Sequence, residues 1–312
     1  MRVLVTGASG FVGGYLAEEL LRSHPGVALF GAVHGPAIHP HVPAGLEPLL
    51  GDLTDPEALA RIVATARPTH VFHLAGFASA AGTDAARIRQ VNVDATVELL
   101  RALAGRGEAC AVLLASSGYV YGATAPGRPA REEDPLSPEG PYASSKAEME
   151  AEARVAVSGS VLSVVAARAF NHTGPYQGPA FAVPAFARQI ARIERGEDPP
   201  VVRVGNLEAR RDFLDVRDVV RAYRMLLCER APGAWETVNV CSGVAVPMRE
   251  VLERLVAAAR VPVSVETDPS RLRPTDMPEC VGDPSRLRSA TGWAPTRTLD
   301  ATLAQTLDWW RR

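Results

Sequence analysis

Short apolar runs alternate with longer amphipathic segments along the first half of the chain. The runs are nearly continuous in Val, Leu, Ala and Phe, which is typical of strands in a parallel sheet covered on both faces. The segments between them repeat apolar residues at helical spacing. This alternation predicts right-handed crossovers and an α/β fold with a Rossmann-type doubly wound parallel sheet. We expect strands at residues 2–6, 29–33, 71–74, 112–117 and 162–167.

The rhythm changes after Arg168, where turn-rich stretches interrupt the regular alternation. Helices are expected at 181–195 and 215–228, and a strand at 237–241 is expected to return to the main sheet. We therefore predict a second, smaller, interleaved substrate-binding domain and a cleft over the carboxyl ends of the strands. The expected dinucleotide-binding domain comprises residues 1–170 and 211–243, and the substrate domain comprises 171–210 and 244–312.

A glycine-rich turn separates the first expected strand from the first expected helix. Gly7, Gly10 and Gly13 follow a Gly-x-x-Gly-x-x-Gly spacing, with Phe11 and Val12 between the last two. Glycines at such a turn let the backbone approach a pyrophosphate closely, and the helix N-terminus adds partial positive charge. The turn therefore predicts a dinucleotide cofactor.

The end of the second expected strand bears on which dinucleotide binds. NAD-binding folds usually place a carboxylate there, where it accepts from the ribose 2′-hydroxyl. No Asp or Glu occurs between Glu19 and Glu47, and His34 takes that place. A missing carboxylate removes a repulsion against a 2′-phosphate. NADP(H) is therefore favoured, and NAD(H) remains possible.

Three further segments are expected to contact the cofactor. Asp52 and Leu53 lie where an acid could approach the adenine, and the alternative for this stretch is a helix cap. Small residues follow the strand at 71–74 and could let its end abut the cofactor. A long helix expected at 84–104 carries one asparagine. The candidate residues of these segments are Asp52, Leu53, Leu74, Ala75, Gly76 and Asn92.

A serine, a tyrosine and a lysine form the candidate catalytic group. Ser117 ends one expected strand, and Tyr142 and Lys146 stand four residues apart in an expected helix that begins near Pro141. Residues at this spacing share a helix face. An ammonium near a phenol should lower the tyrosine pKa, which provides a general acid and base for an alcohol or ketone oxygen. The alternative is a half-buried ring beside a solvated lysine.

Composition limits the partners that the chain could have. The 312 residues carry 33 Lys and Arg against 35 Asp and Glu, which argues against a nucleic-acid partner. No apolar run is long enough to span a membrane, and the chain opens on a strand, so we expect a cytoplasmic protein with no membrane partner. The four cysteines are far apart, so neither a metal site nor a disulfide framework is expected.

Taken together, these motifs resemble the extended short-chain dehydrogenase/reductases that act on nucleotide sugars. The resemblance covers nearly the whole chain, and several motifs occur in the family's order. Within that family the chain is most similar to the GDP-mannose branch, which contains GDP-mannose 4,6-dehydratase and GDP-4-keto-6-deoxymannose reductase. The resemblance rests on the glycine turn, Ser117, Tyr142-x-x-x-Lys146, Arg211-Asp212-Phe213 and the stretches 170–175, 205–208 and 271–278.

The resemblance implies a role for each candidate residue. Tyr142 would donate a proton to the C4 ketone oxygen of a nucleotide sugar, while Lys146 would hold the nicotinamide ribose and Ser117 would polarise the ketone. Arginines would bind the substrate diphosphate through charge-assisted hydrogen bonds. His172 would lie near the nicotinamide, as part of the cofactor site. The implied substrate-binding residues are Ser117, Asn171, Arg188, Arg211, Arg273 and Asp276.

The resemblance also helps to separate activities. A 4,6-dehydratase of this family removes a proton from C5 with a carboxylate that directly follows the catalytic strand. Gly118 and Tyr119 follow Ser117 here, and the nearest downstream acids lie in a loop at 132–134. We therefore expect NAD(P)H-dependent reduction of a nucleotide-linked 4-keto-6-deoxy sugar at C4. The expected substrate is GDP-4-keto-6-deoxymannose, giving GDP-rhamnose or its C4 epimer.

Other functions share the same three residues. A nucleotide-sugar 4-epimerase with tightly bound NAD would use them, but it would prefer a carboxylate after the second strand. A different keto-sugar nucleotide reductase or dehydratase, or a protein that only binds, are further alternatives. Family members commonly dimerise through the two helices near residues 84–104 and 142–157, so a homodimer is expected.

Overall fold

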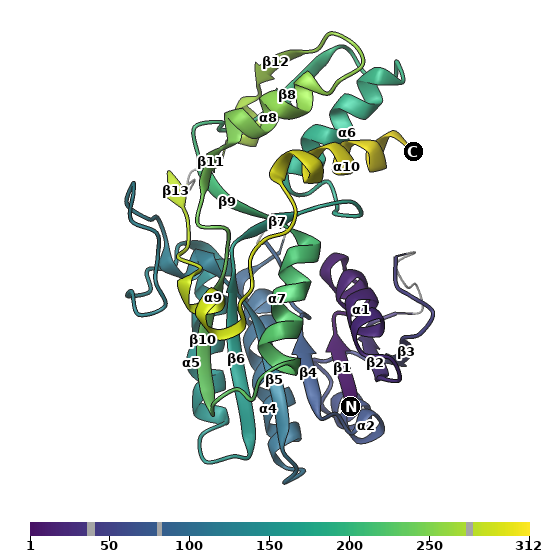
Figure 1. Ribbon diagram of the computed structural model, residues 1–312, viewed down its shortest axis with the longest axis vertical. Coiled ribbons are helices and arrows are strands. Elements are labelled where there is room, and N and C mark those ends of the chain that lie inside the picture. Colours follow the sequence, from purple (N-terminus) through teal and green to yellow (C-terminus); the bar gives the residue numbers. More distant parts are fainter. Residues whose placement is uncertain (36–40, 80–82, 273–276) are drawn as a thin grey trace.

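A seven-stranded parallel sheet forms the centre of the molecule (Figure 1). The structure is a computed structural model, and it describes residues 1–35, 41–79, 83–272 and 277–312. The strand order is β10-β6-β5-β4-β1-β2-β3, so the winding of the sheet reverses between β1 and β4. The predicted Rossmann-type doubly wound sheet is thereby confirmed. Its strands are β1 (Arg2–Thr6), β2 (Ala28–Val33), β3 (Glu47–Leu50), β4 (His70–His73), β5 (Cys110–Ser117), β6 (Leu162–Ala169) and β10 (Trp235–Val240).

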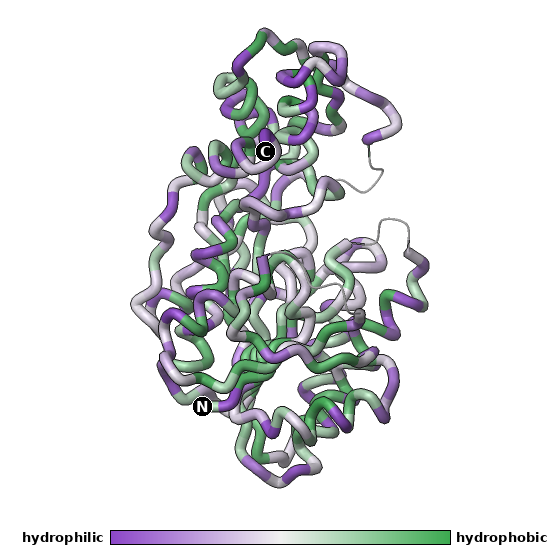
Figure 2. Tube along the Cα trace, turned by 90° about the vertical axis from the view of Figure 1, so that its right-hand side faces the viewer, coloured by the Kyte–Doolittle hydropathy of each residue, from purple (hydrophilic) through white to green (hydrophobic). Residues whose placement is uncertain are grey.

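Helices cover both faces of this sheet because the strands are apolar on both sides. Val3 and Val5 of β1 belong to one core and Leu4 to the other, as the two-residue repeat of a strand requires. Figure 2 shows green apolar and purple polar residues alternating along the helices, which is the pattern of helices with one buried face. The first core lies under α1 (Phe11–Ser23), α7 (Val216–Cys228) and α9 (Ser285–Thr291), and the second under α2 (Pro56–Ala66), α4 (Ala95–Ala104) and α5 (Gly140–Ala156).

The helix predicted at 84–104 is interrupted by a wider turn. Helix α3 (Ala85–Arg89) is followed by a π-helical turn at Gln90–Asp94, and α4 begins directly after it. A π turn inserts one extra residue, and such turns are frequent at functional sites. Here it carries the buried Asn92.

A second region lies at one end of the main sheet and has a core of its own. Phe186, Ile190, Leu252 and Leu303 are among its buried residues. We keep the predicted division into two interleaved domains as a proposal, supported by this separate core. In Figure 1 its helices α6 (Ala182–Glu194), α8 (Met248–Ala257) and α10 (Leu299–Arg311) lie at the top; its strands are β7 (Asn171–Thr173), β8 (Val201–Val204), β9 (Arg210–Asp215), β11 (Ala245–Pro247), β12 (Ser264–Thr267) and β13 (Glu279–Cys280).

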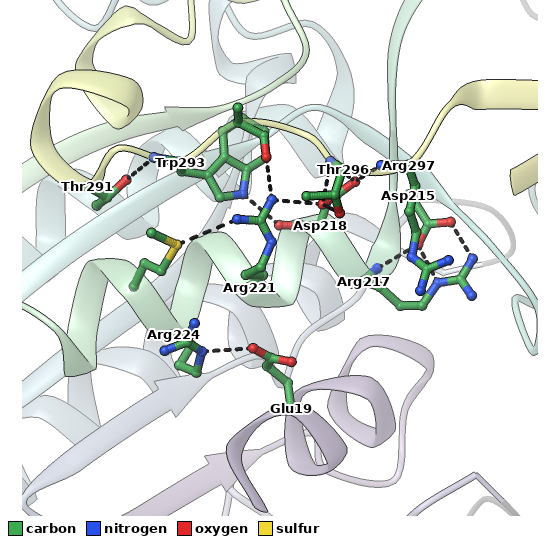
Figure 3. Close-up of polar contacts among 12 residues, drawn as sticks. Glu19, Asp215, Arg217, Asp218, Arg221, Arg224, Thr291, Trp293, Thr296 and Arg297 are labelled. Atoms are coloured by element: carbon green, nitrogen blue, oxygen red, sulfur yellow. Dashed lines mark hydrogen bonds and ion pairs between the residues drawn. The ribbon is translucent and has the colours of Figure 1, made fainter. Parts of the chain in front are cut away.

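Helix α7 holds the C-terminal segment against the main sheet (Figure 3). The Asp218 carboxylate accepts hydrogen bonds from Thr296 N at 3.0 Å, the Thr296 hydroxyl at 2.8 Å and Arg297 N at 3.0 Å. The buried Trp293 indole donates to the Asp218 carbonyl at 3.0 Å and belongs to the first core. Part of the proposed substrate domain therefore packs back onto the dinucleotide-binding domain.

Three further features concern membranes, metals and disulfides. Within the described ranges, no helix is both long enough and apolar enough to cross a membrane. The same ranges contain no cluster of three or more His, Cys, Asp or Glu side chains that could hold a metal ion. All four cysteines are described, and none forms a disulfide.

Candidate active site

The glycine turn is packed too closely for larger residues. Gly7 has a positive φ of 67°, and a β-carbon there would lie 2.8 Å from the Ala75 backbone nitrogen. A β-carbon on Gly13 would lie 2.5 Å from the Gly7 carbonyl oxygen. Helix α1 begins after Gly10 without a side-chain cap, so its first-turn N–H groups can meet an anion. The turn therefore has the form of a pyrophosphate cradle.

A pocket of about 270 Å³ lies beside this turn, near the point where the winding of the sheet reverses. Parallel sheets bind nucleotides at this place. Gly10, Phe11, Val12 and Gly13 lie in the adjoining turn and first helical residues, and Leu74 directly precedes the lining residue Ala75. The predicted residues that line the pocket are Gly7, His34, Asp52, Leu53, Ala75 and Gly76; those not predicted are Ser9, Ala32, Gly51, Thr54, Phe77, Arg87 and Val91.

Asp52 has one carboxylate oxygen engaged by its own turn. Its Oδ1 accepts from Thr54 N and from the Thr54 hydroxyl, both at 2.8 Å. The backbone bond from Thr54 is the main cause that lowers the Asp52 pKa. Its Oδ2 lies 3.8 Å from His34 Nδ1, at the mouth of the pocket. The helix cap considered for this stretch is made by Asp55, which accepts from Glu57 N at 3.0 Å.

Among the pocket residues that were not predicted from the sequence, Arg87 matters most for the chemistry of the pocket. It lies on α3, lines the same pocket as His34, and its Nη1 donates to Gln90 Oε1 at 2.7 Å. Its charge also contributes to the lowered pKa of Asp52. No local motif marks Arg87, because α3 reaches the pocket only through the crossover that follows β4.

The candidate catalytic residues meet at the carboxyl end of β5. Ser117 ends β5, and Tyr142 and Lys146 lie in the first two turns of α5. The Ser117 hydroxyl accepts from Tyr119 N at 3.2 Å and lies close enough to Tyr142 to lower the pKa of that phenol. Lys146 is buried, and its Nζ donates to the Ala115 carbonyl at 2.7 Å. The structure therefore brings the three predicted residues together, and their catalytic roles remain a proposal.

The structure does not show the lowered Tyr142 pKa that was expected from the nearby Lys146. Burial, the largest cause, raises the Tyr142 pKa, whereas the hydrogen bond with Ser117 lowers it and the charge of Tyr119 raises it. Lys146 points to a backbone carbonyl, and burial lowers its own pKa to about 8. The prediction of a lowered tyrosine pKa is therefore wrong for this structure, because loss of hydration outweighs the other influences.

Asn92 connects the pocket to the catalytic helix. Its Oδ1 accepts from Phe77 N at 2.8 Å, and its Nδ2 donates to the Ser145 hydroxyl at 2.9 Å. A β-carbon on Gly76 would lie 2.7 Å from Asn92 Oδ1 and 3.6 Å from Lys146 Nζ. Gly76 thus allows the end of β4 to approach both side chains.

The segment that follows β6 covers the start of α1. The His172 ring stacks on Phe11 with centroids 6.3 Å apart, and its Nδ1 lies 3.1 Å from the Phe170 carbonyl. Burial lowers the His172 pKa, so the ring is neutral near pH 7 and Nδ1 carries the proton that it donates. Asn171 bonds to the Tyr119 hydroxyl through Nδ2 at 3.2 Å. The Tyr119 ring lies edge-on to Tyr142.

The predicted diphosphate-binding arginines have different surroundings. Arg211 is buried, and its Nη1 donates to the Met277 carbonyl at 2.8 Å. Arg188 is exposed on α6, with its guanidinium 5.8 Å from the centre of the Trp310 ring, and its described contacts do not join it to Tyr142. Arg273 and Asp276 lie outside the described residues.

Comparison with known proteins agrees with the geometry of the site. The family model described as GDP-mannose 4,6 dehydratase matches residues 4–306. The chain is 39% identical to GDP-6-deoxy-D-mannose reductase of Pseudomonas aeruginosa, over 99% of this chain and 97% of that protein.

Solved structures are similar over the whole chain. The structure of RMD from Pseudomonas aeruginosa complexed with NADPH has a TM-score of 0.86 and 35% identity, and covers 100% of this chain and 99% of its own. UDP-glucose 4-epimerase of Thermus thermophilus in complex with NAD has a TM-score of 0.88 and 32% identity, with the same coverage. The resemblance inferred from the motifs is therefore confirmed, and the chain belongs to the GDP-mannose 4,6 dehydratase family of extended short-chain dehydrogenase/reductases.

Proposed function

We propose that the protein reduces the C4 ketone of GDP-4-keto-6-deoxymannose with NADPH, giving GDP-rhamnose or its C4 epimer. The observation that carries this proposal is the identity of the two residues that follow Ser117. The place after Ser117, where a dehydratase needs a carboxylate, holds Gly118 and Tyr119, and the Tyr119 phenol bonds to Asn171. Neither Gly118 nor Tyr119 supplies the carboxylate that a dehydratase uses to remove the C5 proton.

The acids of the loop at 132–134 do not supply the missing base. Glu132 accepts from Asn239 N at 2.8 Å. Glu133 pairs with Arg286, and Asp134 accepts from Arg131 N at 2.9 Å. Each carboxylate therefore already has a partner, and no contact within the described residues joins any of the three to Tyr142. This favours ketone reduction over dehydration.

The pocket residues fit a dinucleotide that carries a 2′-phosphate. A β-carbon on Gly7 or Gly13 would fill the pyrophosphate cradle, and β2 ends without a carboxylate before the exposed His34. Arg87 and His34 provide positive charge or hydrogen-bond donors at the same pocket. NADP(H) is therefore the proposed cofactor, with NAD(H) possible, as in the NADPH and NAD complexes of the two structural relatives.

The catalytic residues would act on the two atoms of the ketone. The nicotinamide, when bound, supplies hydride to C4. Tyr142 donates its phenolic proton to the ketone oxygen, and the nearby Ser117 hydroxyl orients that oxygen. Lys146 and Asn92 lie together beside Gly76, where Lys146 would hold the nicotinamide ribose. Together the added hydride and proton convert the ketone to an alcohol.

The 4-epimerase alternative requires a different resting state of Tyr142. An epimerase begins by removing a proton from a sugar hydroxyl, which needs a phenolate or another base. Burial raises the Tyr142 pKa, so the phenol keeps its proton at neutral pH. This protonation state suits a reductase, which begins by donating a proton.

The test is oxidation of NADPH by the purified protein. GDP-4-keto-6-deoxymannose would be made from GDP-mannose by a separate dehydratase, and absorbance at the NADPH band would be followed. Rapid oxidation with a GDP-6-deoxyhexose product supports the proposal. GDP-mannose alone should give no 4-keto product, and UDP-glucose should not be converted to UDP-galactose; either conversion would reject the reductase in favour of a dehydratase or an epimerase.

The proposal also covers the oligomeric state of the protein and its location in the cell. We propose a homodimer that uses the outer faces of α4 and α5, and a cytoplasmic location. Light scattering of the purified protein tests the first point, because a dimer would have twice the 33.2 kDa mass of the chain. A monomer at micromolar concentration would contradict it.

A further inference from the structure

A buried ion pair lies directly beneath the catalytic helix. Glu150 on α5 and Arg168 on β6 are each 6% exposed. Arg168 donates through Nη2 to Glu150 Oε2 at 2.6 Å and through Nε to Oε1 at 3.0 Å. Burial of two charges is costly, and their attraction often only offsets that cost. Such a pair is therefore weak evidence for stability and invites a search for another role.

The pair joins the elements that carry the catalytic residues. Glu150 lies one helical turn after Lys146 on α5, and it also accepts from the Ser116 hydroxyl. Ser116 directly precedes Ser117 on β5, and Lys146 itself donates to Ala115 on the same strand. The Glu150 carboxylate therefore fixes α5 to the end of β5, where the three catalytic residues meet.

Arg168 extends the network to the far edge of the sheet. Its Nη1 donates to the Tyr121 hydroxyl at 2.8 Å, and that hydroxyl donates to Asn239 Oδ1 on β10 at 2.8 Å. Its guanidinium also lies 4.8 Å from the centre of the Tyr121 ring. With so many partners, Arg168 holds the Glu150 carboxylate in one position.

The protonation state of Lys146 depends on burial and on the charge of the groups near it. His73 on β4 is buried between Thr6 and Thr96, and burial lowers its pKa to about 3, so it is neutral. Tyr142, on the same helix, is neutral because its pKa is raised. Burial lowers the Lys146 pKa to about 8, and the Glu150 carboxylate acts in the opposite direction.

We propose that Glu150 is a positioning residue of the reaction: anchored by Arg168 and Ser116, it fixes α5 against β5 and supplies the negative charge that keeps Lys146 an ammonium. This inference rests on the proposed function, because Lys146 is there the group that holds the nicotinamide ribose beside Tyr142. The carboxylate itself is buried and bound by Arg168 and Ser116. Its effect reaches the reaction through Lys146.

The test is the pH profile of kcat/KM for NADPH-dependent reduction in Glu150→Gln. Glutamine keeps the size of the side chain and removes its charge. The pH at which kcat/KM falls on the alkaline side, the alkaline limb of the profile, should be lower by about one pH unit than in the wild type. The ratio of kcat/KM at pH 9 to that at pH 6 should therefore be roughly tenfold smaller in the variant. A change that only loosens the fold would lower the rate at every pH and leave the limb in place.

Glu148→Gln is the matched control. Glu148 lies on the same helix, but its side chain is 39% exposed and pairs with Arg89 at 2.8 Å. Its variant should keep the wild-type pH profile.

Glu150→Gln leaves Arg168 without its buried partner and could fail to fold. The double variant Glu150→Gln/Arg168→Gln removes both charges together, and a smaller shift in the same direction is expected because loss of the Arg168 charge partly offsets loss of the Glu150 charge that raises the Lys146 pKa. An unshifted alkaline limb in a folded single or double variant would overturn the inference. Failure of the wild type to oxidise NADPH would instead reject the proposed function.

Discussion

Tyr142, Ser117 and Lys146 have distinct chemical states in the same small site. Burial raises the Tyr142 pKa further above neutral pH, whereas the nearby Ser117 hydroxyl lowers it. Lys146, with a pKa of about 8, is the member that titrates nearest to neutral pH. In the proposed reaction the phenol would donate a proton, and deprotonation of the Lys146 ammonium would set the upper pH limit of activity.

Tyr142→Phe should lower kcat by a factor of about 10² to 10⁴, because it removes the proton donor and keeps the ring. Its dissociation constant for NADPH, measured by fluorescence titration, should remain within about twofold of the wild type. Retained turnover would remove Tyr142 from the mechanism.

Arg87→Met should weaken NADPH binding by roughly tenfold, since a charge-assisted bond to phosphate contributes about 1.5 kcal/mol or more. NADH lacks the 2′-phosphate, so its dissociation constant should change little. Arg89→Met is the control, because Arg89 on the same helix pairs with Asp94 and Glu148 and does not line the pocket. Equal losses for both cofactors would contradict the role given to Arg87.

Sequence reasoning found the site residues that lie in local motifs. Gly7 and Ser117 could be placed because each stands at a strand end, and Gly13 because it lies in the first turn of the helix that follows. Arg87 could not, because only the three-dimensional path of α3 brings it to the pocket. The direction of the Tyr142 pKa was also missed, since it depends on burial, which spacing along a helix does not reveal.

At the scale of elements, the apolar runs located the inner strands because these are buried on both faces. Edge strand β3 was not predicted: its residues are mostly exposed, and it contains Pro48. The π turn at Gln90–Asp94 was also missed, since its sequence continues the helical pattern on both sides. Elements that depend on tertiary contacts therefore could not be predicted from periodicity.

Asp218→Ala should lower the free energy of unfolding by about 3 kcal/mol, because Thr296 N and Arg297 N would lose their buried acceptor. Urea unfolding at neutral pH measures the change. Asp308→Ala on α10, whose side chain is 57% exposed, should change stability by less than about 0.5 kcal/mol. Equal stability of the two variants would show that the α7 contacts do not hold the C-terminal segment.

At the scale of the whole molecule, the reaction depends on how two regions meet. The parallel sheet supplies the pocket and Ser117, while the segment at 171–177 places His172 over the start of α1 and Asn171 against Tyr119. The Tyr15 hydroxyl donates to the Pro175 carbonyl at 3.1 Å and helps to hold this segment in place. The changed rhythm after Arg168 predicted a second region, whereas these contacts could not be predicted from the sequence.

The most direct test of the central claim follows the hydrogen that reaches C4. The protein would be incubated with GDP-4-keto-6-deoxymannose and NADPH that carries deuterium at the transferable position, and the sugar product would be analysed by NMR and mass spectrometry. Reduction at C4 predicts one deuterium at C4 and one NADPH oxidised per product. A product with hydrogen at C4, or deuterium at another carbon, would contradict the assignment of this site to ketone reduction.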